Sequence, residues 1–193
     1  VAKYTDNYIL LLSASKIFSY AGERIALVCI SPAVFDRRNK FFEEFYEMPT
    51  YGEAYIFGVL YVCSSGTSHA AQHAMAAMLN AAADGSLNFV DDCREYGRRA
   101  ARAKELFLSN GFSLVYADDE GTPISDGFFF TVTYPGMDSE TLQKELMRYG
   151  VSTISLPGTG SEHEGLRICV SKLDTEEIYQ SLAQRLTNFH NDH

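Results

Sequence analysis

The sequence predicts an α/β fold whose second half forms an α+β subdomain. Two short apolar runs near the start, each closed by a polar turn, predict buried strands. Two long helical patterns occupy the middle of the chain. After Gly111 the order of predicted elements is strand, strand, helix, strand, strand, helix, which is typical of an α+β unit. With 193 residues, 46% apolar and 21% charged, the chain is long enough to bury a core.

The first part of the chain carries two predicted strands, Tyr8–Leu12 and Arg24–Ile30. Pro32 opens a predicted helical stretch through Phe45, because proline is tolerated in the first turn of a helix. The longest apolar run, Ala54–Cys63, falls well short of the ~20 residues that a membrane-spanning helix needs. We expect this run to be a strand or a core segment.

Two helices follow. Ser64–Ser68 is a turn and an N-cap signal, and apolar residues recur at helical spacing from His69 to Ala83. Asp84-Gly85 ends this helix. A longer helical pattern runs from Phe89 to Ser109, and Asn110-Gly111 is a C-terminal stop signal.

The last part of the chain alternates strands and helices. The predicted strands share an enrichment in β-branched and aromatic residues, and the predicted helices end or begin at glycine and capping residues. The strands are 112–117, 127–134, 151–156 and 166–170, and the helices are 139–149 and 175–189.

Charge and cysteine content exclude several classes of protein. The formal net charge is -9 without a basic cluster, so nucleic acid and anionic membranes are poor partners. The four cysteines form no CxxC pair, and no signal peptide is visible, so we expect reduced, mostly buried thiols in a cytoplasmic protein. His69 and His73 are spaced for a metal, but HAAQH lacks the HExxH glutamate and a third ligand, so no metal site is predicted.

The loop between the first two predicted strands contains candidate catalytic and phosphate-binding residues. Lys16 lies in a hydroxyl-rich segment between the first two strands, and Arg24 opens the second strand. A lysine that forms a Schiff base needs a site that lowers its pKa, and a phosphate anchor needs a guanidinium with hydroxyl donors. Ser13 and Arg24 are candidates for that anchor. By itself, a lysine between serines is most often a solvated loop residue.

The segment S-A-S-K-I-F-S-Y-A-G-E-R-I resembles the lysine signature of the class I/II aminotransferases, which are fold-type I enzymes that use pyridoxal 5'-phosphate (PLP). Residue type and spacing agree at Ser13, Ser15, Lys16, Gly22 and Arg24. The resemblance implies that Lys16 binds PLP covalently as an internal aldimine and moves the proton between substrate Cα and cofactor. It also implies that Ser13 and Arg24 bind the phosphate, with a contribution from Ser15.

A second region, Gly150–Ser171, resembles the family's small-domain segment, in which a glycine-rich loop leads into a strand that carries the substrate arginine. Arg167 occupies that position. A planar guanidinium binds the α-carboxylate of an amino acid in a bidentate manner. The alternative is an arginine on the exposed face of a strand that forms a surface ion pair.

The resemblance implies the C-terminal part of a PLP-dependent transferase fold: residues 1–87 as the end of the large PLP-binding domain, 88–110 as a connecting helix and 111–193 as the small α+β domain. The implied function is amino transfer between an α-amino acid and a 2-oxo acid, by a full-length homodimer. The family residues that contact the pyridine ring precede the lysine and cannot be placed here, so we expect a fragment without normal transaminase activity of its own. Two alternatives are another fold-type I enzyme (a C–S lyase, decarboxylase or synthase) and a non-catalytic module.

Overall fold

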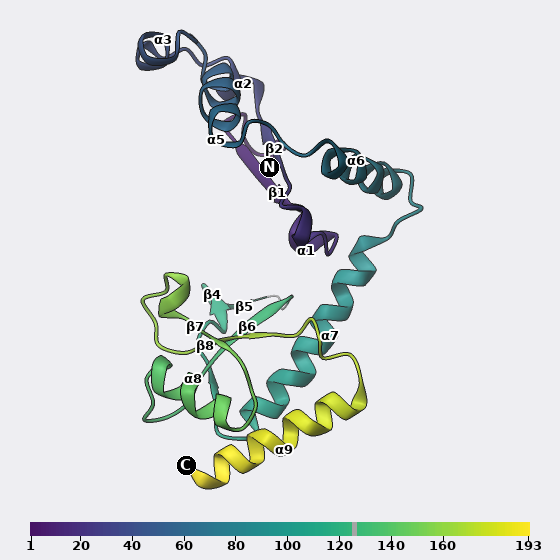
Figure 1. The fold of residues 1–193 in the computed structure, drawn as a ribbon, viewed down its shortest axis with the longest axis vertical. Helices are drawn as coiled ribbons and strands as arrows, with labels where there is room; N and C mark the ends of the chain where they lie inside the picture. Colours follow the sequence, from purple (N-terminus) through teal and green to yellow (C-terminus); the bar gives the residue numbers. More distant parts are fainter. Residues whose placement is uncertain (125–126) are drawn as a thin grey trace. The chain divides into compact units, whose positions relative to one another are not determined.

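The computed structural model describes residues 1–124 and 127–193 and consists of two compact units, Val1–Phe89 and Val90–His193. Figure 1 traces the first unit in purple to dark teal and the second in lighter teal to yellow. Within the described ranges, no helix combines the length and the apolar composition that crossing a membrane requires. The predicted mixed α/β class is confirmed.

The first unit is built on an antiparallel hairpin of β1 (Ile9–Ser13) and β2 (Ala26–Ile30). Ile9 pairs with Ile30 at one end and Ser13 with Ala26 at the other. Both strands lie where the apolar runs predict them. At the Ile30 end, the buried hydroxyl of Ser31 donates to the carbonyl oxygen of Asp6 at 2.5 Å, which ties the incoming chain to the hairpin.

The prediction of a single helix from Pro32 to Phe45 is wrong. The structure has two short helices, α2 (Pro32–Phe35) and α3 (Lys40–Tyr46). Asn39 separates them because its backbone is extended, with φ of -145°, and its side chain caps α3 by accepting from the Phe41 amide at 2.9 Å. Asparagine is a strong N-cap residue, and its preference for starting a new helix here outweighs the apolar periodicity across the break.

The expected strand or core segment at Ala54–Cys63 is instead helical and partly exposed. A continuous helical run comprises α4 (Tyr51–Glu53), the π-helix η2 (Ala54–Tyr61) and α5 (Val62–Ser64). Thr50 caps its start by accepting from the Glu53 amide at 3.4 Å. A short apolar run without periodicity does not distinguish strand from helix, so the cap and the packing decide.

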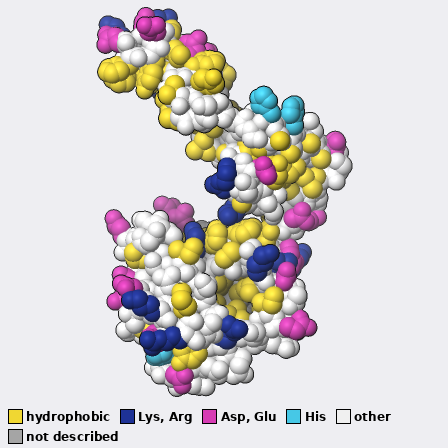
Figure 2. Space-filling model, in the orientation of Figure 1, with side chains coloured by type: hydrophobic (Ala, Val, Ile, Leu, Met, Phe, Trp, Pro, Cys, Tyr) yellow, Lys and Arg dark blue, Asp and Glu magenta, His cyan; other side chains and the backbone are white. Residues whose placement is uncertain are grey.

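Two glycines let this helical run pack closely. A Cβ at Gly52 would lie 2.1 Å from the Phe35 ring, and one at Gly58 would lie 2.7 Å from the Tyr46 ring. Eight apolar side chains of the region are exposed, and Figure 2 shows apolar surface over the end of the unit that carries α3. They are Phe41, Phe45, Ile56, Phe57, Val59, Leu60, Tyr61 and Val62.

Helix α6 (His69–Ala83) has the predicted bounds, and Ser68 caps it by accepting from the Ala71 amide at 3.4 Å. Its buried face packs on the hairpin. The small core of the first unit consists of Ala14, Ile25, Ala71 and Met75. The segment that contains Lys16 is therefore anchored to α6 through Ala14 and Ile25.

The second unit is a four-stranded antiparallel sheet with the order β3-β6-β8-β7, joined to helices α7, α8 and α9. The predicted order of strands and helices after Gly111 is confirmed, with shorter strands and an additional small hairpin. The elements are α7 (Phe89–Leu108), β3 (Ser113–Leu114), β4 (Asp118–Asp119), β5 (Thr122–Pro123), β6 (Phe129–Thr133), α8 (Ser139–Arg148), β7 (Ile154–Ser155), the 3-10 turn η3 (Pro157–Thr159), β8 (Leu166–Cys169) and α9 (Glu176–Asp192).

One face of this sheet is buried. Because side chains alternate along a strand, Phe130 and Val132 of β6 share a face with Leu166 and Ile168 of β8, and all four are buried. Residues of the three helices complete this core, among them Phe107, Leu142, Leu146, Leu186 and Phe189, each with an exposed fraction of 0%. The opposite face of the sheet carries the intervening residues, including Arg167.

The expectation of mostly buried cysteines is wrong. Cys29 and Cys93 are half-buried, Cys63 and Cys169 are exposed, and all four are free thiols. Cys63 lies on the exposed apolar helical run, and Cys169 alternates with the buried Ile168 and therefore lies on the outer face of β8.

Candidate cofactor and substrate sites

The segment that joins β1 to β2 contains the four candidate cofactor residues. Lys16 lies in the one-turn helix α1 (Ala14–Ile17), and Ser13, the last residue of β1, caps that turn by accepting from the Ser15 amide at 3.3 Å. The Ala14 amide donates to the Ile25 carbonyl oxygen at 3.3 Å, so the segment closes on itself above the hairpin. The sequence predicted a loop here, and the structure adds a helical turn and the 3-10 turn η1 (Ala21–Glu23).

Arg24 lies at the other end of this connection, with an exposed side chain and a left-handed backbone (φ 53°). Its Nη1 donates to the carbonyl oxygen of Ala21 at 2.6 Å. Ser19 in the same connection also has a positive φ of 52°. Such conformations cost non-glycine residues ~1–2 kcal/mol and tend to occur where function constrains the backbone.

The hairpin register brings the ends of this connection together. Ser13 pairs with Ala26, which lies two residues after Arg24, so Ser13 and Arg24 lie at the same end of the hairpin. Ser13, Lys16 and Arg24 are exposed, and Ser15 is half-buried. The donor set is one amine, two hydroxyls and one guanidinium. This set fits a ligand with a carbonyl group and a phosphate, because hydroxyl and guanidinium donors bind phosphate and an amine condenses with a carbonyl.

Two buried residues that the sequence did not single out hold this connection. Ala14, two residues before Lys16, has an exposed fraction of 0%, and Ile25, next to Arg24, has 8%. Both pack with Ala71 and Met75 of α6. The alternation of apolar and polar residues at the ends of the connection was the available signal, but it did not identify α6 as the partner.

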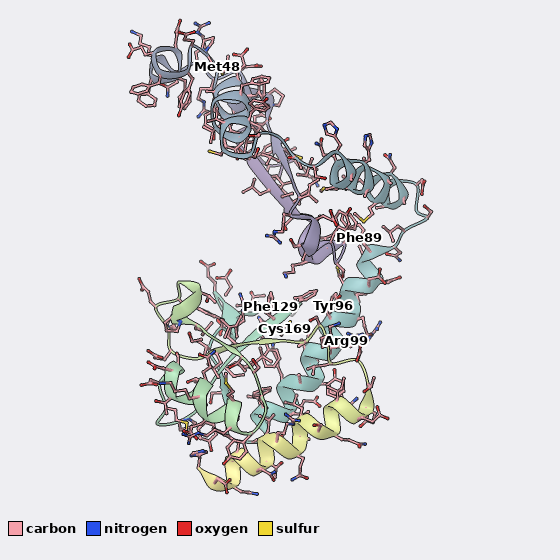
Figure 3. All side chains as sticks on the ribbon, viewed as in Figure 1. Met48, Phe89, Tyr96, Arg99, Phe129 and Cys169 are labelled. Carbon is pink, nitrogen blue, oxygen red and sulfur yellow. The ribbon has the colours of Figure 1, made fainter. Side chains whose placement is uncertain are left out.

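Arg167 lies in β8 at the centre of the second unit's sheet, where it pairs with Thr131 of β6 and Ile154 of β7. It is half-buried on the face opposite the core. Its guanidinium carbon lies 4.4 Å from the centroid of the Phe129 ring, a cation–π contact. Figure 3 labels Phe129 and Cys169, which pair across the same two strands.

The guanidinium of Arg167 has no carboxylate within ion-pair distance in residues 1–124 and 127–193. The alternative of a surface ion pair is therefore not found in the described part of the chain. Among the described residues, this guanidinium contacts the Phe129 ring.

Glu164 fixes the start of the strand that carries Arg167, a role the sequence did not reveal. Its carboxylate accepts from the Ser139 amide at 2.6 Å and from the Ser139 hydroxyl, and the Ser139 Oγ in turn accepts from the Gly165 amide at 2.7 Å. These hydrogen bonds from Ser139 lower the pKa of Glu164. The link joins the first turn of α8 to the residue before β8, and no local pattern connects residues so far apart in the chain.

The fold is shared with part of two solved aminotransferase structures. The structure is similar to that of YbdL from Escherichia coli, described as having a methionine aminotransferase function, with a TM-score of 0.63 and 18% identity over 93% of this chain and 41% of that one. It is also similar to a tetra mutant of the Thermus thermophilus aspartate aminotransferase, with a TM-score of 0.57 and 19% identity over 94% of this chain and 43% of that one.

The chain belongs to the family of class I and II aminotransferases, because the family model matches residues 1–186. It spans about two-fifths of the length of the two similar structures. No curated protein sequence matches it. At these identities the structural likeness establishes the fold alone.

Proposed function

We propose that this chain contributes the cofactor lysine and the carboxylate-binding arginine of a PLP-dependent aminotransferase, which transfers an amino group between an α-amino acid and a 2-oxo acid. The observation that carries the proposal is the donor set of Ser13, Ser15, Lys16 and Arg24 in the one connection that closes the β1–β2 hairpin. Family membership supports it independently.

The phosphate of the cofactor would be bound by the Ser13 hydroxyl and the Arg24 guanidinium, with the Ser15 hydroxyl beside them. A phosphate takes several hydrogen bonds at once, and an arginine supplies two parallel N–H donors together with a permanent positive charge. The Nη1 of Arg24 already donates to Ala21, which orients the fork and leaves its other N–H groups for the ligand. Bound PLP supplies the electron sink for bond cleavage at the substrate Cα.

Lys16 would hold the cofactor's aldehyde carbon through its Nζ and then move the proton at the substrate Cα. Both tasks need the neutral amine for part of the cycle, and both need an amine that returns to the same place. The helical turn α1, fixed by the Ser13 cap and by the buried Ala14, gives Lys16 a defined backbone position.

Arg167 would bind the α-carboxylate of the amino acid. The carboxylate is present in every α-amino acid and every 2-oxo acid, so a residue that binds it serves both halves of the reaction. The contact of Arg167 with Phe129 restricts the rotation of the guanidinium, which lowers the entropy lost when a carboxylate binds.

The first test is reductive trapping. The chain is mixed with one equivalent of PLP, reduced with borohydride, digested and examined by mass spectrometry. We expect modification of Lys16 to exceed that of each of the other five lysines by about tenfold, because the proposed phosphate anchor lies in the same connection as Lys16. Equal modification of all exposed lysines would contradict the proposal.

Matched variants sharpen this test. Lys16→Ala is expected to remove the main adduct, whereas Lys40→Ala, an exposed lysine of the same unit, leaves it in place. Pyridoxal lacks the phosphate, so comparing the modification of Lys16 by PLP and by pyridoxal measures the contribution of the phosphate anchor. Arg24→Gln should remove the preference for PLP over pyridoxal, and Arg38→Gln should preserve it. Arg38 has a side-chain exposure of 68% and pairs with Glu43, so its loss changes only surface charge.

The second test concerns Arg167 in the full-length protein that carries this chain. Arg167→Gln is expected to raise KM for the amino acid about 100-fold, which corresponds to ~3 kcal/mol for two lost hydrogen bonds to a charged group. Steady-state kinetics with several amino acids and 2-oxoglutarate measure this change, and release of glutamate distinguishes transamination from lyase or decarboxylase chemistry.

Arg148→Gln is the control for Arg167, since Arg148 is an exposed arginine of the same unit that pairs with Glu145 at 2.9 Å. It should leave KM unchanged. An Arg167→Gln enzyme with the KM of the unaltered protein would assign Arg167 a purely structural role.

A further inference from the structure

An apolar groove of about 440 Å³ lies on the helical side of the second unit, between α9 and the segment that leads from α8 to β7. Its floor is formed by Phe107, Val151, Ile168, Leu173 and Leu182. Its volume lies within the range of small-molecule sites, which combine an apolar lining with a few polar groups. The groove contains none of the residues assigned above to the cofactor or the substrate.

Two residues of opposite charge line the groove. Glu177 and Arg185 both line it, and both project from α9. They are eight residues apart, so their backbones are separated by ~12 Å along the helix axis at 1.5 Å per residue. An octanoate chain is about this long. The other residues that form the floor are apolar, which favours an alkyl chain over a polar one.

Arg185 is held in place with one donor nitrogen still available. Its Nε donates to the Ser181 hydroxyl at 3.1 Å, and its Nη1 donates to the carbonyl oxygens of Gly150 at 2.6 Å and Tyr149 at 3.4 Å. Its Nη2 has no hydrogen-bond partner in the part of the chain that the structure describes. A guanidinium fixed by three neutral acceptors keeps its full positive charge for an anionic ligand.

The wall opposite α9 holds a second unsatisfied polar group. The Oγ1 of Thr153 is buried and has no hydrogen-bond partner among the described residues. Thr153 lines the groove three residues beyond Gly150, which accepts from Arg185. Buried hydroxyls are nearly always paired, and this one would reach a bound polar group or its water after rotation of the Thr153 side chain.

Glu177 restricts the ligand to a single negative charge. The hydrogen bonds of its own backbone amide and of Thr175 at the start of α9 lower the pKa of Glu177, so its carboxylate is ionised near neutral pH. A ligand with a second carboxylate at its far end would be repelled there. The groove is therefore complementary to an alkyl chain with one anionic end.

We propose that this groove binds a medium-chain alkyl monocarboxylate, with the carboxylate at Nη2 of Arg185 and the chain along the floor toward Glu177. The site is separate from the cofactor and substrate roles proposed above. Its test uses no PLP and no turnover, so its failure would leave the proposed function unaffected, and the reverse also holds.

The experiment titrates the chain with octanoate, octanol and octanedioate and follows the methyl resonances of Leu173, Ile178 and Leu182 by NMR. We expect octanoate to move these resonances with an affinity about tenfold higher than octanol, since octanol lacks the charge-assisted contact. Octanedioate is expected to bind about tenfold more weakly than octanoate, because of Glu177. Equal affinity for octanoate and octanol, or unmoved groove methyls, would overturn the proposal.

Arg185→Gln is expected to lower the affinity for octanoate to that for octanol and to leave the affinity for octanol unchanged. Retained octanol binding in this variant demonstrates that the groove is still folded, so the loss is specific to the carboxylate. Arg148→Gln, an exposed arginine of α8 outside the groove, is the matched control and should preserve the preference. Octanoate binding that is equal in the Arg185→Gln and unaltered chains would assign the carboxylate to another place.

Discussion

Replacing Gly165 with valine is expected to lower the free energy of unfolding of the second unit by about 2–6 kcal/mol, the sum of an overpacking cost and a backbone strain cost of ~1–3 kcal/mol each. Gly165 has φ of +141°, a region that side-chain-bearing residues avoid. A Cβ there would lie 2.7 Å from the backbone oxygen of Val132 and 2.7 Å from Cγ2 of Val115. The backbone oxygen belongs to the central strand β6 and has no room to move.

Urea denaturation followed by circular dichroism measures this loss, and Gly136→Val separates its two causes. Gly136 also has a positive φ, +76°, but a Cβ there meets nothing within 4 Å. We therefore expect Gly136→Val to show only the strain cost. If the two variants were equally stable, the close approach of Gly165 to β6 would be irrelevant to stability.

Truncating Phe107 to alanine is expected to destabilise the second unit by about 3–5 kcal/mol, the usual cost of removing a buried aromatic ring. Its side chain is fully buried, with an exposed fraction of 0%. It forms edge-to-face contacts with Phe112, at a centroid distance of 5.0 Å, and with Phe130, at 5.7 Å. The ring thus joins α7 to β6, and its loss leaves a cavity at the centre of the core.

The neighbouring residue Leu108 provides the control for Phe107. It belongs to the same helix but is 47% exposed, so Leu108→Ala removes little buried area. Its effect on the unfolding free energy should stay within ~0.5 kcal/mol, as for surface substitutions in general. A thermal or urea midpoint that falls equally in both variants would show that α7 packs through a different face.

The helices with strong local signals could be predicted from the sequence, and those decided by packing could not. Helix α6 begins at a serine cap and ends at Asp84-Gly85, and both signals are local. Apolar periodicity continues across Asn39 and predicts one helix. The cap contact of Asn39 shows that a second helix begins there instead. The run from Ala54 to Tyr61 is uniformly apolar, so it has no period, and its contact with the Tyr46 ring at Gly58 is a packing feature without a local signal.

The candidate site likewise has features that the local sequence predicts and features that depend on contacts between distant residues. Ser13, Lys16 and Arg24 belong to one short connection, so the sequence alone groups them, although not the buried contacts with α6 that hold them. The outward face of Arg167 follows from its buried neighbours Leu166 and Ile168 through strand alternation. The link from Glu164 to Ser139 joins residues 25 positions apart through side-chain hydrogen bonds, and such pairs have no signature in a single sequence.

The unequal cores of the two units affect the segment that contains Lys16. Among the described residues, four buried ones form the core around that segment, whereas fourteen form the core of the second unit. Segments with few buried apolar contacts open locally at a lower free-energy cost than the rest of a fold. A ligand that binds only the closed form of the hairpin connection shifts this opening equilibrium by mass action. The cofactor would then act as a structural element of the first unit, since its phosphate would join the two ends of a segment that the polypeptide alone secures weakly.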